Sequence, residues 1–180
     1  VDVVRAGAVR RLHARDIRVN RRRVQAAELE DLLFARKTGV VFLHHDSASI
    51  GAVAAQHLLS TGVLRSFVFL APGESAPWAD QREDSFAAAL SKCDFALTRL
   101  TTAQDAVASV STLRALPKPI GLFAASDKIA LHAVSLGRAA RLRMPDELAV
   151  LGVDNDESIC ESTTPTLSSV ATTPETLGYE

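Results

Sequence analysis

The chain has 180 residues, 47% of them hydrophobic, and a net charge of −1, so it can bury a real core as one domain or as two small lobes. Residues 1–40 hold ten Lys/Arg against five Asp/Glu, whereas the remainder holds ten against sixteen. The basic residues are scattered and lack interleaved aromatic side chains, so a solvated face explains them better than a nucleic-acid surface. No apolar run approaches the roughly 20 residues that span a bilayer, which excludes a membrane-spanning protein.

Cysteine usage and the N-terminus indicate the compartment. Cys93 and Cys160 have no metal-ligand spacing and are expected to be reduced, although a disulfide between them stays open. No signal peptide begins at Val1, so we expect a cytoplasmic protein with no membrane partner. The chain lacks an initiator Met and stops where a helix starts after Pro174, which predicts a piece of a longer polypeptide.

Apolar runs and helical periodicity predict alternating strands and helices along the chain. Strands are expected at 1–4, 39–43, 66–70, 95–100, 120–123, 148–153 and 165–170. Helices are expected at 6–14, from Ile50 to a stop at Gly62, after Arg82, and at 103–116 and 127–140. Residues 71–80 are expected to form a loop. Such alternation predicts a doubly wound α/β fold with parallel sheets.

The stretch 119–154 organises the chain as strand, helix and strand. A right-handed crossover places the carboxyl ends of both strands at one edge, where open α/β sheets bind ligands. Ser126, Asp127 and Asp154 stand at those ends and form a polar cluster suited to a neutral, hydroxyl-rich ligand. Structural roles remain open, with Asp127 capping the helix and Asp154 ending the strand.

Two side chains after the strand 66–70 are further candidates. Trp78, the only tryptophan, is either a lid that stacks on a sugar or an anchor of its loop. Arg82 either offers a fork of donors to ligand hydroxyls or pairs with Glu83 or Asp84 on the surface.

Other chemistry is not expected. His44 and His45 are adjacent in an extended segment and point to opposite faces, so we expect no metal site. The P-loop, the Gly-x-Gly-x-x-Gly and Gly-x-Ser-x-Gly motifs and the His-Glu-x-x-His motif are all missing, so we expect no enzyme and no cofactor.

The segments FAASDKIALHAV, MPDELAVLGVDND and PTLSSV resemble the effector-binding domain of LacI/GalR-type transcriptional regulators. The resemblance covers most of residues 39–180. It implies a periplasmic-binding-protein-like type I fold of two α/β lobes, with a partial first lobe at 1–62 and 160–180 and a second lobe at 63–159. The form GVDNDESIC with TPTLSSV is most similar to the sensor domain of AraC-type xylose-operon activators.

This resemblance also implies ligand contacts and partners. Asp46, Arg82 and Asp154 match acidic and arginine contacts of the family, and Trp78 matches a cleft-lining position. Ser126 stands where many members have Asn, which leaves fewer hydrogen-bonding groups for a sugar. The expected function is binding of a monosaccharide, with a pentose such as xylose favoured, in an interlobe cleft that closes. A homodimer is expected, with Ala130 and Val134 as a partner face, and DNA binding through a domain outside this chain. The alternative is a solute-binding protein of a sugar transporter.

Overall fold

The computed structural model describes residues 3–5, 9–12 and 42–172, and the chain divides into two compact units. The larger unit comprises residues 1–6 and 47–172, and the smaller unit comprises 7–46 and 173–180. The strands of the larger unit are β1 (Val3–Arg5), β4 (Ser66–Ala71), β5 (Leu97–Thr101), β6 (Ile120–Ala124), β7 (Leu148–Asp154) and β8 (Ser168–Ala171). Its helices are α2 (Ser47–Ser60), α3 (Pro77–Ser91), α4 (Ala106–Ala115), α5 (Asp127–Ala139) and the short α6 (Glu157–Cys160). In the smaller unit, β2 (Val9–Leu12) pairs antiparallel with β3 (Phe42–His45).

The larger unit is built on one sheet with the strand order β1-β8-β7-β6-β4-β5. Every neighbouring pair in it is parallel, which confirms the predicted α/β class. Because the strands run in the same direction, the carboxyl ends of β4, β6 and β7 meet at one edge of the sheet.

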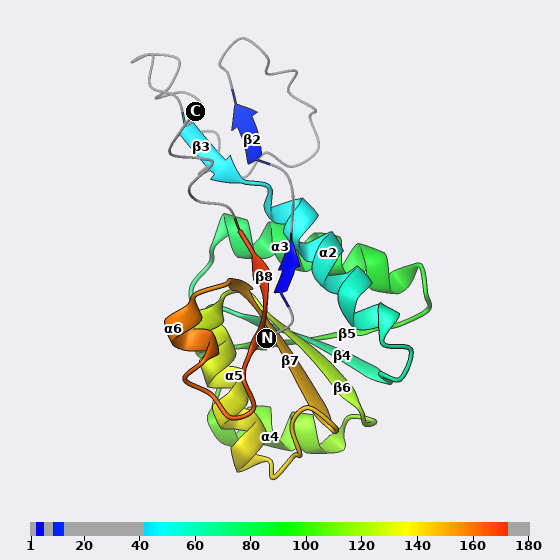
Figure 1. Cartoon of the computed structure of the whole chain (residues 1–180). Coiled ribbons are helices and arrows are strands. Elements are labelled where there is room, and N and C mark those ends of the chain that lie inside the picture. The colour runs from blue at the N-terminus through cyan, green and yellow to red at the C-terminus, as the bar shows by residue number, and fades with distance from the viewer. Residues whose placement is uncertain (1–2, 6–8, 13–41, 173–180) are drawn as a thin grey trace. The chain divides into compact units, whose positions relative to one another are not determined.

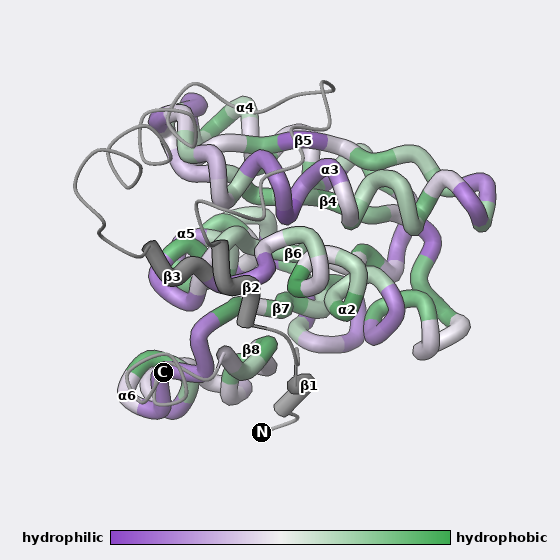
Figure 2. Tube along the Cα trace, turned by 90° about the horizontal axis from the view of Figure 1, so that it is seen from above, coloured by the Kyte–Doolittle hydropathy of each residue, from purple (hydrophilic) through white to green (hydrophobic). Residues whose placement is uncertain are grey.

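Helices cover both faces of this sheet, with α2 and α3 on one side and α4 and α5 on the other (Figure 1). Alternate residues of β4 supply the two cores: Phe67 and Phe69 pack towards α2 and α3, whereas Val68 and Leu70 pack towards α4 and α5. Figure 2 shows the central strands β4, β6 and β7 mainly in the hydrophobic colour and helix α3 with much hydrophilic colour. Burial on both faces explains why these strands are continuous apolar runs in the sequence.

Helices α2 and α3 approach each other closely at Gly51. A Cβ added to Gly51 would lie 2.2 Å from the backbone oxygen of Arg82, so a larger residue there would push the two helices apart. Helix α2 therefore packs within the larger unit, and β8 extends its sheet beside β7. The compact units thus divide the chain before α2 and after β8. The lobe boundaries expected at 62 and 160 stay a prediction.

Three local predictions were wrong. The segment expected as a helix at 6–14 contains strand β2, since pairing with β3 decides its backbone conformation. Helix α3 begins at Pro77, whose ring favours a first helical turn, so Trp78 lies in a helix and not in a loop. Ala130 is fully buried and Val134 is 7% exposed, so this apolar line packs in the chain's own core and forms no partner face.

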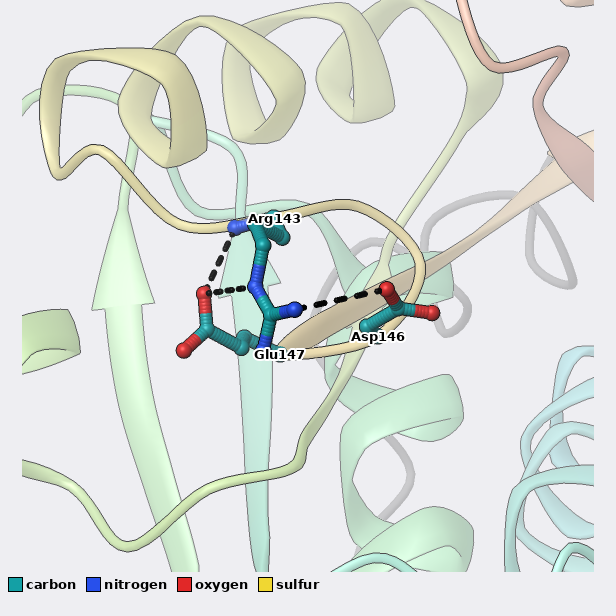
Figure 3. Close-up of polar contacts among 3 residues, drawn as sticks. All are labelled: Arg143, Asp146 and Glu147. Atoms are coloured by element: carbon teal, nitrogen blue, oxygen red, sulfur yellow. Dashed lines mark hydrogen bonds and ion pairs between the residues drawn. The ribbon is translucent and has the colours of Figure 1, made fainter.

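The connection from α5 to β7 is closed by a small ionic cluster (Figure 3). Glu147 accepts hydrogen bonds from the backbone N–H and the Nε of Arg143, at 2.9 and 3.2 Å, and Asp146 lies 3.9 Å from the same guanidinium. The hydrogen bonds from Arg143 lower the pKa of Glu147 below its usual range. The cluster is exposed, so it shapes the turn and contributes little to stability.

Both cysteines are free in the structure, Cys93 exposed and Cys160 buried. Within the described ranges, no helix is long and apolar enough to cross a membrane.

Candidate functional site

The candidate site lies where β4, β6 and β7 end. Helix α3 starts shortly after β4, and α5 starts directly after β6, so the first turns of two helices border this edge. Five of the six predicted residues lie in the larger unit, at the ends of these strands or at the start of the helices that follow: Trp78, Arg82, Ser126, Asp127 and Asp154. Asp46 belongs to the smaller unit, immediately before α2, and its predicted ligand contact stays a prediction.

Arg82 is the most unusual side chain at this edge. It is only 5% exposed, and one Nη donates a hydrogen bond to the backbone oxygen of Ala125, at the end of β6. Its Nε is buried and has no hydrogen-bond partner. Burial lowers the pKa of Arg82 below its ordinary value, and the charges of Asp154 and Asp127 act in the opposite direction. A guanidinium that feels the charge of two carboxylates at this edge carries five N–H donors, a fork that matches an oxygen-rich group.

Glu83, one of the surface partners considered for Arg82, pairs with Arg99 instead. Glu83 accepts a hydrogen bond from Nε of Arg99 at 2.8 Å, whereas Arg82 points inward from the same helix. The Arg82 guanidinium lies over the indole of Trp78, with 4.8 Å from Cζ to the ring centroid. This cation–π contact holds the ring in place while 40% of Trp78 remains exposed. The exposed indole surface can stack on the apolar face of a sugar.

Asp154 ends β7 with a backbone φ of 109°, and the residue is exposed. Neighbouring atoms partly desolvate its carboxyl group and raise its pKa, whereas the positive charge of Arg82 lowers it. The carboxylate offers acceptors beside the donors of Arg82, a combination that matches hydroxyl groups, which both donate and accept.

Asp127 is placed differently from Asp154. It is 1% exposed, and both carboxylate oxygens accept hydrogen bonds from the chain itself. Oδ1 accepts from Oγ of Ser169 at 2.7 Å, and Oδ2 accepts from the backbone N–H of Asp156 at 2.9 Å. Burial raises its pKa, and these hydrogen bonds act against that effect. Sequence reasoning missed Ser169 and Asp156 as its partners.

Ser126 is the N-cap of α5, where its Oγ accepts a hydrogen bond from the backbone N–H of Ile129 at 3.4 Å. The hydroxyl hydrogen is still free to donate to a ligand. The helix N-terminus and this hydroxyl therefore add donors to the edge where Asp154 supplies acceptors.

A separate pocket of about 310 Å³ lies between α5, the start of β7 and the segment before β8. Its lining includes Val134, Met144 and Leu148 and none of the predicted site residues. The chemistry of the site, an arginine with a free donor beside carboxylates and an indole, is at the other end of β7. In the part of the chain that the structure describes, no group of three or more His, Cys, Asp or Glu side chains could hold a metal ion.

The family model of the periplasmic binding protein-like domain matches residues 55–180. The chain belongs to the periplasmic-binding-protein-like domain family. The match includes β4 to β8 and therefore every element that carries the candidate site.

Sequence and structure comparisons find proteins that are similar to part of this chain. The xylose operon regulatory protein of Haemophilus influenzae is 24% identical over 148 residues, which are 77% of this chain and 38% of that protein. A periplasmic binding protein/LacI transcriptional regulator of Alkaliphilus metalliredigens, in complex with D-xylulofuranose, superposes with a TM-score of 0.64 at 20% identity and covers 74% of this chain and 52% of that one. The transcriptional regulator CelR, in complex with cellobiose, has a TM-score of 0.59 at 26% identity, over 74% of this chain and 42% of that one. The chain thus spans well under two thirds of the length of these relatives.

Proposed function

We propose that this periplasmic-binding-protein-like chain is part of the sugar-sensing domain of a LacI-type transcriptional regulator. The observation that carries the proposal is the buried Arg82, whose Nε is unpartnered and whose guanidinium lies over Trp78 and faces the charge of Asp154. Burying an arginine with an unpartnered donor costs free energy, which supports a binding role for Arg82 over a merely structural one.

The chemistry of Arg82, Asp154 and Trp78 indicates the class of ligand. A donor fork, a carboxylate acceptor and an exposed indole face match a small neutral molecule that has several hydroxyls and one apolar face. A monosaccharide has these features. A pentose such as xylose is the first candidate, supported by the relatives named for xylose operon regulation and for a complex with D-xylulofuranose.

Each site residue has a role in this proposal. Arg82 donates to sugar oxygens, Asp154 accepts from sugar hydroxyls, and Trp78 stacks on the ring. Ser126 donates one further hydrogen bond from the start of α5. The sugar is bound and released without chemical conversion, because these groups include no nucleophile with a general base. Dimer formation, and DNA contact through a region outside this chain, stay predictions.

The test is a thermal-shift panel of pentoses and hexoses on the full-length protein. A ligand at a hundred times its dissociation constant adds about 2.7 kcal/mol to the free energy of unfolding. We expect one sugar to raise the melting temperature of the wild type and of Asp146→Ala, a control in the exposed ionic cluster, to the same extent. In Asp154→Ala, a tenfold loss of affinity leaves about 1.4 kcal/mol or less of that stabilisation. A folded wild type that no sugar stabilises, or a shift in Asp154→Ala as large as in the wild type, would contradict the proposal.

A further inference from the structure

Asp127 is the centre of a buried hydrogen-bond cluster, here called the Asp127 hub, which also contains Asp156, Cys160 and Ser169. Its oxygens accept from Ser169 Oγ at 2.7 Å, from the Asp156 N–H at 2.9 Å and from the Cys160 Sγ at 3.7 Å. The hub joins the first turn of α5 to β8 and to the segment between β7 and α6. Because these elements are far apart in the sequence, no local motif reveals it.

The hub is bonded to the turn that follows Asp154. Asp154 and Asn155 have positive φ values of 109° and 56°, conformations that residues other than glycine rarely adopt. The Asn155 N–H donates to Ser169 Oγ at 3.0 Å, and the next N–H donates to Asp127. An unfavourable backbone conformation persists only where surrounding contacts impose it, and here two consecutive amides are bonded to the hub.

The tight packing around Asp127 argues against direct contact between its carboxylate and a ligand. A Cβ added to Gly152 would lie 2.1 Å from Asp127 Oδ1, so the carboxylate sits directly against the β7 backbone. With 1% of the residue exposed and each oxygen bonded within the chain, the carboxylate is out of reach of a ligand in this structure.

We propose that Asp127, acting with Ser169, is a positioning residue that fixes the backbone turn from which Asp154 reaches the sugar. The role in sugar binding rests on the function proposed above, whereas the hold on the turn does not. If Asp127 is a positioning residue, substitutions in the hub should weaken sugar binding only while the Asp154 carboxylate is present.

The first arm of the test needs no ligand. Amide hydrogen exchange is measured by NMR on the full-length protein for Ser169→Ala and Asp127→Asn, at a temperature where each variant is folded. Controls are Ser109→Ala, which removes another buried hydroxyl, and Asp105→Asn, which alters the N-cap of α4. We expect the Asn155 and Asp156 amides to exchange at least about tenfold faster in the hub variants and unchanged in the controls. Unchanged exchange in Ser169→Ala would overturn the proposal, even if Asp127→Asn does not fold.

The second arm measures sugar affinity in a double-mutant cycle. Ser169→Ala should weaken binding about tenfold, and the same change in an Asp154→Asn background should cause little further loss. Equal losses in both backgrounds, or wild-type affinity in Ser169→Ala, would overturn the positioning role. If the wild type binds no sugar, the proposed function fails, and the exchange arm still decides whether the hub holds the turn.

Discussion

Gly152 lies so close to the Asp127 carboxylate that the substitution Gly152→Ala should disturb the Asp127 hub directly. The new Cβ would lie 2.1 Å from Asp127 Oδ1, 3.2 Å from its Cγ and 3.3 Å from its Cα. The carboxylate must move, and this movement weakens the hydrogen bonds that it accepts from Ser169 Oγ and the Asp156 N–H. Each hydrogen bond to a charged group contributes about 1.5–3 kcal/mol, and replacing a strand glycine recovers only about 0.5–1 kcal/mol.

We therefore expect Gly152→Ala to lower the free energy of unfolding by about 2 kcal/mol, a loss of roughly 4–8 °C in melting temperature for a chain of this size. The assay is urea unfolding followed by circular dichroism. Gly121→Ala, in the same sheet, is the matched control, because its Cβ would meet the flexible Cδ1 of Leu64 at 2.7 Å. The reasoning would be refuted if Gly152→Ala were as stable as the wild type or no less stable than Gly121→Ala.

The remaining predictions concern the core, pH and the thiols. Phe86→Ala should cost about 3–5 kcal/mol in urea unfolding, since Phe86 is fully buried with ring contacts at 5.0 Å to Phe123 and 6.5 Å to Phe67; a loss under about 1 kcal/mol would refute that packing. The pKa of Asp154 is higher in the folded protein than in the unfolded chain. The contribution of Asp154 to stability is therefore fully present below its pKa in the unfolded chain and is lost as pH rises through its pKa in the folded protein. Urea midpoints should therefore favour Asp154→Asn over the wild type increasingly between about pH 3 and pH 7, and a constant difference would contradict the shift. Burial and the nearby Asp127 charge raise the pKa of the Cys160 thiol to about 12, so a thiol reagent at pH 8 should label exposed Cys93 rapidly and Cys160 only on unfolding. Equal labelling rates in the native protein would show that Cys160 is accessible.

Long apolar runs made the sheet predictable. Residues 66–70, 120–123 and 148–153 are apolar because both faces of the sheet are covered, and each forms a central strand. The spacing of Ile129, Ala133, Leu136 and Ala140 predicts one apolar line on helix 127–140; the last three are buried and Ile129 is half-buried. Short elements were less predictable, since β2 depends on a partner strand and not on its own residue pattern.

The site was predictable where a residue follows a strand directly. Ser126 and Asp154 could be placed at the carboxyl edge because strand direction alone brings them there. The burial of Arg82 was not predictable, because its side chain bonds to the Ala125 carbonyl, 43 residues further along the chain. The partnership of Asp127 with Ser169 joins residues 42 apart, and glycine in the GVD segment is the only local sign of it.

The most direct test of a sugar site at this edge is a fluorescence titration that follows Trp78, on which the Arg82 guanidinium is stacked. Full-length wild type, Asp154→Ala and Trp78→Phe are titrated with the sugar that stabilises the wild type most. The account predicts a saturable change in emission for the wild type that disappears in Trp78→Phe and shifts to at least about tenfold higher sugar in Asp154→Ala. Saturable binding by calorimetry without any change in Trp78 emission, or with unchanged affinity in Asp154→Ala, would place the sugar elsewhere and contradict the account.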